Sequence, residues 1–393
     1  MSESIVIVSA ARTPMGGLQG SLSSVSAPAL GSVAIKAVIE RSGLAAEQVS
    51  ELLFGCVLPA AVGQAPARQA ALGAGLPNSL PCTTINKVCG SGMKAIMLAH
   101  DQIKADPDAV IVAGGMENMS RAPYMLNKAR GGYRMGHGEL LDHMFYDGLQ
   151  DADSGRLMGT FAQQTANTLG ITRQQMDTFA INSLERAQLA IRKGYFNNEI
   201  APVVVTSRRG EYVIDTDEQP GLANIEKIPT LRAAFAENGT ITAANSSSIS
   251  DGASALLIMS EAAAKHHQLA PIARIVAHSS HAQQPAEFTI APIDAINKVL
   301  KKAGWAKDDV DLFEINEAFA LVTLAAMQAL QLAPEKVNVH GGACALGHPL
   351  GSSGSRIVVT LLHALQQHHK TRGVATLCIG GGEATAVAIE LLH

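Results

Sequence analysis

The chain has 393 residues, of which 47% are hydrophobic, 16% are charged and 4% are aromatic, and its formal net charge is −4. This balance is typical of a compact globular protein, and the small net charge argues against a nucleic acid or an anionic membrane as a partner. No apolar stretch reaches the roughly 18 residues of a transmembrane helix, and the first residues do not resemble a signal peptide. We therefore expect a cytoplasmic protein of about two or three structural units.

The first 117 residues alternate short β-branched runs with segments of helical pattern. Strands are expected near Ile5–Val8, Glu51–Phe54 and Ala109–Gly115, and helices near Ala27–Ser42 and Gly90–Lys104. Such alternation is typical of an α/β protein with a mainly parallel sheet that helices cover on both faces.

Residues 118–244 lack this alternation. They contain Gly- and Met-rich loops such as Lys128–Gly138, interrupted by a helical pattern near Arg173–Lys193. A segment of this length without regular alternation is usually functional rather than a linker. We therefore predict an inserted loop domain here, between an N-terminal unit (1–117, completed by about 245–270) and a C-terminal unit (271–393).

The last third of the chain repeats the order of the first. It predicts strands near Ile272–Val276, Val310–Ile315 and Val374–Gly382, and helices near Ile293–Ala303 and Gly351–Gln366. Four landmarks recur in the same order, between 261 and 268 residues later: Ile7 with Ile275, Val49 with Val310, Gly92 with Gly354, and Gly114 with Gly380. This repetition indicates an internal duplication.

Five cysteines are present, at positions 56, 82, 89, 344 and 378. An odd number without a C-x-x-C pair disfavours a disulfide framework and a zinc site, so we expect free thiols and no metal. A single cysteine in such a protein is usually a small buried hydrophobic residue. Cys89 and Cys378 require another interpretation, because each lies in a glycine-rich motif.

The motif Asn86–Ile96 places Cys89 before Gly90, Ser91 and Gly92 and an apolar helical pattern. Cys89 would then lie at a helix N-terminus, where the partial positive charge and free backbone N–H groups favour the nucleophilic thiolate. From spacing alone, a nucleophile and a buried structural thiol are equally good interpretations.

A second motif, Gly341–Gly354, holds His348 before Pro349 in a glycine-rich loop. Pro349 disfavours helical torsions at His348, and a histidine on such a loop can accept a proton from a thiol. In the duplicated pattern, this loop precedes the helix of the second half in the way that the loop of Cys89 precedes the helix of the first half. The two side chains would therefore face each other across a pseudo-twofold axis.

The third motif, Leu377–Glu383, is a strand that contains Cys378 and ends in three glycines. A second thiol at this edge of a sheet could act as an acid or base, and the N–H group of Gly380 and its neighbours could hold an oxyanion. A buried structural cysteine is the alternative. A dinucleotide-binding loop is disfavoured because the spacing is G-G-G-E.

Together, these motifs resemble the thiolase family over essentially the whole chain, and most closely its short-chain branch, the acetyl-CoA acetyltransferases. The matching segments share the family's order and spacing: Asn86–Gly92, Gly114–Ser120, Asn316–Phe319, Gly347–Pro349 and Cys378–Gly382. The resemblance implies a thiolase fold with duplicated α/β/α/β/α layered halves and an inserted loop domain that binds coenzyme A (CoA). It also implies a homodimer or a homotetramer.

The resemblance further implies a reversible, ping-pong Claisen condensation of two acetyl-CoA molecules to acetoacetyl-CoA and CoA. Cys89 would carry the acetyl group, His348 would accept its proton, and Cys378 would deprotonate the second acetyl-CoA. Asn316 would hold a water at the enolate oxygen, and the N–H groups of Cys89 and Gly380 would hold the acyl oxyanion. No metal or redox cofactor is implied, since CoA is substrate and product.

The implied substrate- and CoA-binding residues are Ser247, Met158, Ala318, Phe319 and Lys227. Two departures from the family pattern leave part of this set open. Gly221 stands where many short-chain members have Arg, so Arg208, Arg209 or Lys227 would replace that contact to the CoA nucleotide. Leu157 stands where those members often have His, so the acyl chain length is open.

Three alternatives remain at this level. A 3-ketoacyl-CoA thiolase with a preference for longer chains would use the same three catalytic groups. A decarboxylating ketoacyl synthase would lack the second cysteine. A non-catalytic acyl-CoA- or lipid-binding protein would leave Cys89, His348 and Cys378 without a role.

Overall fold

The computed structural model describes residues 3–208 and 210–392 of the chain. A ten-stranded sheet runs through this described part, in the order β12-β13-β14-β11-β1-β10-β5-β3-β4, with β2 (Gly16–Gly17) paired to β10. None of the described helices combines the length and low polarity needed to span a membrane.

The chain builds this sheet twice with the same order of elements. The first half consists of β1 (Ile5–Arg12), α1 (Ala27–Ser42), β3 (Glu51–Gly55), α2 (Pro66–Gly73), β4 (Cys82–Ile85), α3 (Ser91–Ala105), β5 (Val110–Asn118) and β10 (Ser250–Ser260). The second half consists of β11 (Ala273–Ala282), α8 (Ala291–Ala303), β12 (Leu312–Ile315), α9 (Ala320–Leu330), α11 (Leu350–Gln367), β13 (Arg372–Ile379) and β14 (Glu383–Leu391). In the place of β4, the second half has a single parallel bridge between Phe313 and Val337.

The sheet is mixed, so the prediction of a mainly parallel sheet is wrong. β3 pairs in parallel with β4 and β5, and β12 with β13. The pairs that involve β1, β10, β11 and β14 are antiparallel. β14 follows β13 after three residues, which is too short a connection for the crossover that parallel pairing requires. β1 pairs with β11 at Val6 and Ile7, and this seam joins the two halves.

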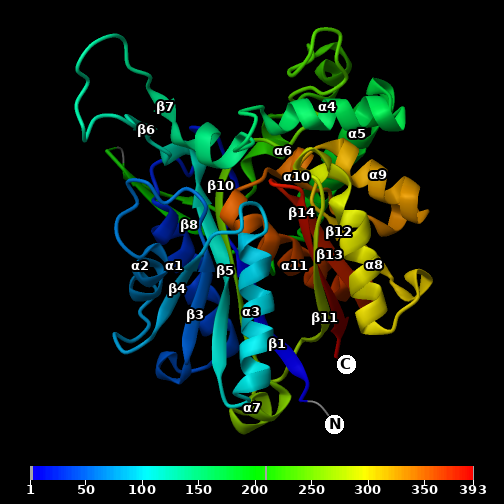
Figure 1. Cartoon of the computed structure of the whole chain (residues 1–393). Helices are drawn as coiled ribbons and strands as arrows, with labels where there is room; N and C mark the ends of the chain where they lie inside the picture. The colour runs from blue at the N-terminus through cyan, green and yellow to red at the C-terminus, as the bar shows by residue number, and fades with distance from the viewer. Residues whose placement is uncertain (1–2, 209, 393) are drawn as a thin grey trace.

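The elements form five layers, as the sequence predicted. α1 packs on β1, β5 and β10, and α8 packs on β11, β13 and β14. α3 and α11 pack on each other and on strands of both halves, so they form the middle layer of an α/β/α/β/α arrangement. Figure 1 shows α1 and α2 on one side, α3 and α11 in the centre, and α8 and α9 on the other side.

The two central helices cross at glycines. A Cβ atom on Gly92 would lie 2.5 Å from Ser355 Oγ and 2.8 Å from Ser355 N, and one on Gly354 would lie 2.5 Å from Met93 N. Gly92 and Gly354 are also the pair that the sequence repeat matched. Because glycine has no Cβ, the backbones of α3 and α11 approach as closely as this crossing requires.

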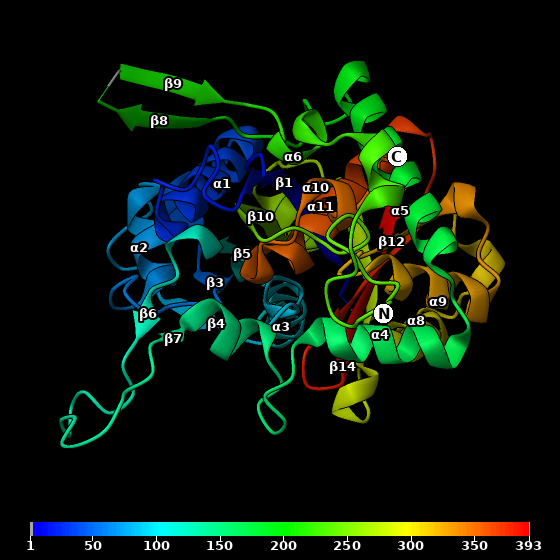
Figure 2. The ribbon, with the colours of Figure 1, turned by 90° about the horizontal axis from the view of Figure 1, so that it is seen from above.

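The segment between β5 and β10 lies over one end of the layers, as Figure 1 shows. Its regular elements are β6 (Tyr124–Met125), β7 (Leu141–Asp142), α4 (Met158–Leu169), α5 (Arg173–Lys193), β8 (Val203–Ser207), β9 (Gly210–Ile214) and α6 (Glu218–Leu222), beside short 3₁₀ and π turns. The β8–β9 hairpin extends away from the body (Figure 2). The division of the chain into three domains with the boundaries given above stays a prediction.

One buried arginine attaches this segment to the sheet. Arg12, at the end of β1, donates to Glu199 Oε1 at 2.5 Å and to both carboxylate oxygens of Asp217 at 2.7 and 2.9 Å. All three side chains are fully buried. Loss of one partner from a buried ion pair typically costs about 3–5 kcal/mol, because the other charge remains buried without compensation.

Gly92→Ala should destabilise the protein. An alanine in a helix is ordinarily more favourable than a glycine by about 1 kcal/mol. Here the added methyl would meet the backbone of α11, and overpacking typically costs about 1–3 kcal/mol. We expect the midpoint of thermal unfolding to fall by several degrees.

Gly221→Ala is the matched control, because Gly221 is exposed in a short helix and has no atom within 4 Å of the added Cβ. Its unfolding midpoint should stay near that of the unchanged protein. Equal midpoints for the two variants would contradict a close crossing of α3 and α11.

Candidate active site

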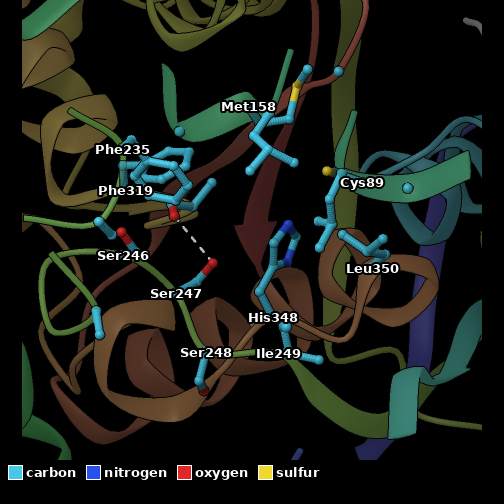
Figure 3. Close-up of a pocket in the computed structure, with 18 of the residues that line it drawn as sticks. Cys89, Met158, Phe235, Ser246, Ser247, Ser248, Ile249, Phe319, His348 and Leu350 are labelled. Atoms are coloured by element: carbon cyan, nitrogen blue, oxygen red, sulfur yellow. Dashed lines mark hydrogen bonds between the residues drawn. The ribbon is translucent and has the colours of Figure 1, made fainter. Parts of the chain in front are cut away.

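A cavity of about 510 Å³ lies where the N-terminal ends of α3 and α11 meet the end of β13. Cys89, His348, Cys378 and Gly380 all line it. The four residues come from three motifs that are far apart in the sequence, and the fold brings them to one place. Figure 3 shows Cys89 and His348 directed into this cavity.

Cys89 and His348 have similar positions in the two halves, although the repeat that pairs Gly92 with Gly354 does not align them residue for residue. α3 begins at Ser91 and α11 begins at Leu350, so each side chain lies two residues before the start of its helix. Val88, immediately before Cys89, has φ of 47°, which a β-branched residue rarely adopts. Such backbone strain typically costs about 1–3 kcal/mol and concentrates at functional sites.

The loop before Cys89 is fastened to the end of β13. Lys87 forms an ion pair with Glu383, which follows the three glycines after Cys378 and Ile379. A Cβ atom on Gly90 would lie 2.3 Å from Ile379 Cδ1, so a side chain at this position would force the Ile379 side chain to move. These two contacts hold the loop of Cys89 against the strand of Cys378.

Burial raises the pKa of the half-buried Cys89 thiol to about 11. The N–H groups of Gly380 and of Cys89 itself oppose this rise, because both donate toward the sulfur and favour the thiolate. We predicted that the helix N-terminus would favour the thiolate form of Cys89. The pKa is instead raised overall, because the cost of burying the thiolate exceeds its stabilisation by the two N–H donors, so that prediction is wrong. The resemblance to thiolases predicted that these two N–H groups hold the oxyanion formed on the acyl carbonyl of Cys89.

His348 is held in one orientation. Its Nδ1 lies 2.5 Å from Ser353 Oγ, and the Ser353 hydroxyl donates to Pro349 O at 2.9 Å. This arrangement places the proton of the ring on Nδ1, which donates to Ser353, and leaves a lone pair on Nε2. That Nε2 atom is buried and has no hydrogen-bond partner among the described residues. It is therefore available as a proton acceptor.

Burial, together with the nearby charge of Arg356, lowers the pKa of His348 to about 3. The imidazole is consequently neutral in the resting protein. Asn316 is buried behind the ring rather than in the wall of the cavity, with its Nδ2 3.5 Å from His348 Nδ1. Arg356 Nη2 donates to Asn316 Oδ1 at 3.4 Å. The role of Asn316 in holding a water stays a prediction.

Cys378 is fully buried at the end of β13 and forms part of the cavity wall. Burial raises the pKa of its thiol well above the usual value, and charge on Cys89 raises it further. Cys89 and Cys378 line the same cavity. At rest, both thiols are protonated and the cavity carries no charge from its three reactive side chains.

The expected acyl-binding residues lie in the wall of the same cavity. Met158, Ala318 and Phe319 line the cavity, and the rings of Phe235 and Phe319 pack edge to face with centroids 6.2 Å apart. Ser247 also lines it and donates its hydroxyl to Ala318 O at 3.1 Å, the dashed line in Figure 3.

The residues expected to contact the CoA nucleotide do not line the cavity. Lys227 and Arg208 are exposed and form no part of its wall, and Arg209 lies outside the described residues. Gly221 is exposed as well. The roles of these residues in binding stay predictions.

Sequence reasoning missed several residues of the site. Phe235 and Phe288 line the cavity from segments without a motif, so no sequence signal could have identified them. Ser353 had a signal, since it follows His348 by five residues and therefore lies in the first turn of α11. Val88 could be identified only from its backbone torsion.

Comparison with known proteins agrees with this arrangement. A family model described as "Thiolase, N-terminal domain" matches residues 5–262, and one described as "Thiolase, C-terminal domain" matches residues 269–391. The mitochondrial acetyl-CoA acetyltransferase of Bos taurus is 49% identical over 99% of this chain and 92% of its own length. The acetyl-CoA acetyltransferase of Cupriavidus necator is 48% identical over 98% of this chain and 99% of its own length.

Two solved structures are similar over nearly their whole length. The crystal structure of the Bacillus anthracis acetyl-CoA acetyltransferase superposes with a TM-score of 0.97 at 40% identity, covering 100% of this chain and 99% of that one. The Acat5 thiolase from Ascaris suum, crystallised in complex with coenzyme A, gives a TM-score of 0.94 at 42% identity, covering 99% and 100%. With both family models matched and these relatives aligned from end to end, this chain belongs to the thiolase family.

Proposed function

We propose that this protein is an acetyl-CoA C-acetyltransferase that catalyses the reversible condensation of two acetyl-CoA molecules to acetoacetyl-CoA and CoA. The observation that carries the proposal is the convergence on Cys89 of an imidazole lone pair, two N–H donors and a second thiol within one cavity. The names of the relatives support the choice of acetyl-CoA as substrate.

The first half-reaction transfers an acetyl group to Cys89. His348 Nε2 accepts the thiol proton, and the thiolate attacks the thioester carbonyl of acetyl-CoA. The N–H groups of Cys89 and Gly380 already point toward the sulfur, so they can hold the oxyanion that forms beside it. The departing CoA thiolate takes a proton from Cys378 and leaves as CoA.

The second half-reaction forms the carbon–carbon bond. The Cys378 thiolate removes a proton from the methyl group of a second acetyl-CoA, and the enolate attacks the acetyl carbonyl on Cys89. The imidazolium of His348, with a water held by Asn316, would stabilise the enolate oxygen. Collapse of the intermediate releases acetoacetyl-CoA, and Cys89 recovers its proton from His348. Only acyl and proton transfers occur, so the proposed reaction needs no metal or redox cofactor.

Acetyl labelling tests the two half-reactions separately. After incubation with acetyl-CoA, mass spectrometry should find an acetyl group on the peptide that contains Cys89. In Cys378→Ser the label should persist, because the CoA thiolate is a good leaving group that can take its proton from water instead of Cys378. Condensation should fall by about 10²–10⁴-fold, because removal of the methyl proton requires the Cys378 base. Cys89→Ser should lose the thioester label and turnover.

Cys82→Ser is the matched control, since Cys82 is half-buried on β4 and does not line the cavity. It should retain both the label and the condensation rate. A wild-type protein without a label on Cys89 would support the non-catalytic binding alternative instead, and an unimpaired Cys378→Ser would remove the role given to Cys378.

The chief alternative is a 3-ketoacyl-CoA thiolase that prefers longer chains. The apolar wall of the cavity limits which acyl chain lengths fit. Leu157, Met158, Phe235 and Phe319 all line the cavity. Discrimination per methylene in such a pocket is about 10–200-fold. We expect kcat/KM for thiolysis to be at least about tenfold higher for acetoacetyl-CoA than for a longer 3-ketoacyl-CoA. Phe319→Ala should narrow that ratio, and a wild-type preference for the longer substrate would reject our proposal.

We also propose a homodimer or homotetramer in the cytoplasm. Several apolar side chains on and between β6 and β7 are exposed in the single chain: Tyr124, Leu126, Tyr133, Met135 and Leu140. Apolar side chains exposed within one short segment are candidates for protein–protein contacts. A monomer in light scattering would contradict the oligomer.

A further inference from the structure

Three side chains suited to metal binding meet outside the cavity. His100 and Asp101 lie in the last turns of α3, and His278 lies on β11. His100 Nδ1 lies 2.9 Å and His278 Nε2 lies 2.8 Å from the same atom, Asp101 Oδ1. The two imidazole rings are edge to face, with centroids 4.8 Å apart. The fold thus assembles two nitrogens and one carboxylate oxygen from segments 177 residues apart.

We propose that His100, Asp101 and His278 bind a divalent transition-metal ion of the zinc type. Two imidazoles with one carboxylate suit Zn²⁺, Co²⁺ and Ni²⁺, whereas Mg²⁺ and Ca²⁺ require mainly oxygen ligands. Three protein ligands leave the fourth tetrahedral position to water.

The geometry is close to what such an ion requires. Bonds of about 2.0–2.1 Å place the ligand atoms of a tetrahedral site about 3.3 Å apart. The three candidate ligand atoms all lie within 4.8 Å of one another. Asp101 has 56% of its side chain exposed, so the carboxylate can turn aside and admit an ion between the two rings. Only 4% of His100 is exposed, so its imidazole is held in place by the surrounding side chains and can move less than Asp101.

The surrounding charges set the strength of binding. Burial lowers the pKa of both His100 and His278, so neither imidazole must lose a proton at neutral pH before it coordinates. Lys94 and Lys104 on α3 and Lys302 on α8 also face the cluster, and their charges oppose a cation. With one carboxylate against three ammonium groups, we expect binding far weaker than that of four-ligand structural zinc sites.

The site lies away from the reacting groups. His100 follows Cys89 by eleven residues along α3, which corresponds to about 16 Å at 1.5 Å per residue. None of the three ligands lines the active cavity. A bound ion would connect the central helix of the first half to the first strand of the second half. It should therefore stabilise the fold without supplying chemistry to the reaction.

Co²⁺ is the probe of choice, since its visible spectrum reports the coordination directly. The experiment uses untagged, full-length protein whose Cys89 has been alkylated, so that this thiol does not compete for the ion. We expect about one Co²⁺ per chain by equilibrium dialysis, and tetrahedral absorption bands. At one hundred times Kd, the unfolding midpoint should rise by about 3 °C.

Three variants locate the ion. His278→Gln and Asp101→Asn should each weaken Co²⁺ binding at least about tenfold and abolish the shift in unfolding midpoint. His281→Gln is the matched control on the same strand, because the His281 ring contacts Gln283 and Asp294 rather than the cluster. It should bind Co²⁺ as the unchanged protein does.

Two results would overturn the proposal. One is the absence of saturable Co²⁺ binding at millimolar ion. The other is binding that survives in Asp101→Asn and His278→Gln, which would place the ion elsewhere, such as at the paired rings of His340 and His368. Asp101 is mostly exposed, so Asp101→Asn should fold even if the change at His278 disturbs β11.

Discussion

The crossing of α3 and α11 is the constraint on which the rest of the structure depends. Two helices can approach this closely only where both surfaces lack side chains, and Gly92 and Gly354 meet that requirement reciprocally. Because the crossing lies in the first turns of both helices, the residues just before them are brought together over it. Cys89 and His348 therefore owe their proximity to rigid packed elements rather than to the conformation of loops.

A second constraint is electrostatic. The cavity is walled by apolar side chains, where an unpaired charge is costly, and burial accordingly keeps Cys89, His348 and Cys378 neutral. Charge separation between the thiol and the imidazole becomes favourable only when a substrate carbonyl fills the space between fixed donors. In the proposed mechanism, the site is thus inert when empty and reactive when occupied.

Much of this was predictable from the sequence, because local patterns report local structure. The helix at Arg173–Lys193 and the strands β1, β3, β5, β11, β12 and β13 follow from periodicity and turn residues. The three motifs also contain Cys89, His348 and Cys378, which line the cavity, whereas β4, β10 and β14 were not predicted. Antiparallel pairing of β10 and β14 was not predictable in this way, since it depends on partners chosen in the folded chain. The same holds for the net pKa of Cys89, for Phe235 in the cavity wall, and for the meeting of His100 with His278.

The attachment of the loop segment through Arg12 has a practical consequence. Its guanidinium donates to Glu199, before the β8–β9 hairpin, and to Asp217, after it. This clamp fixes the chain on both sides of the hairpin at the same buried arginine. The projecting part of the hairpin, visible in Figure 2, lies beyond that clamp and extends away from the body. A fluorophore, an affinity handle or a surface-tethering group grafted there would lie outside the wall of the cavity, but beside Arg208, a predicted contact of the CoA nucleotide.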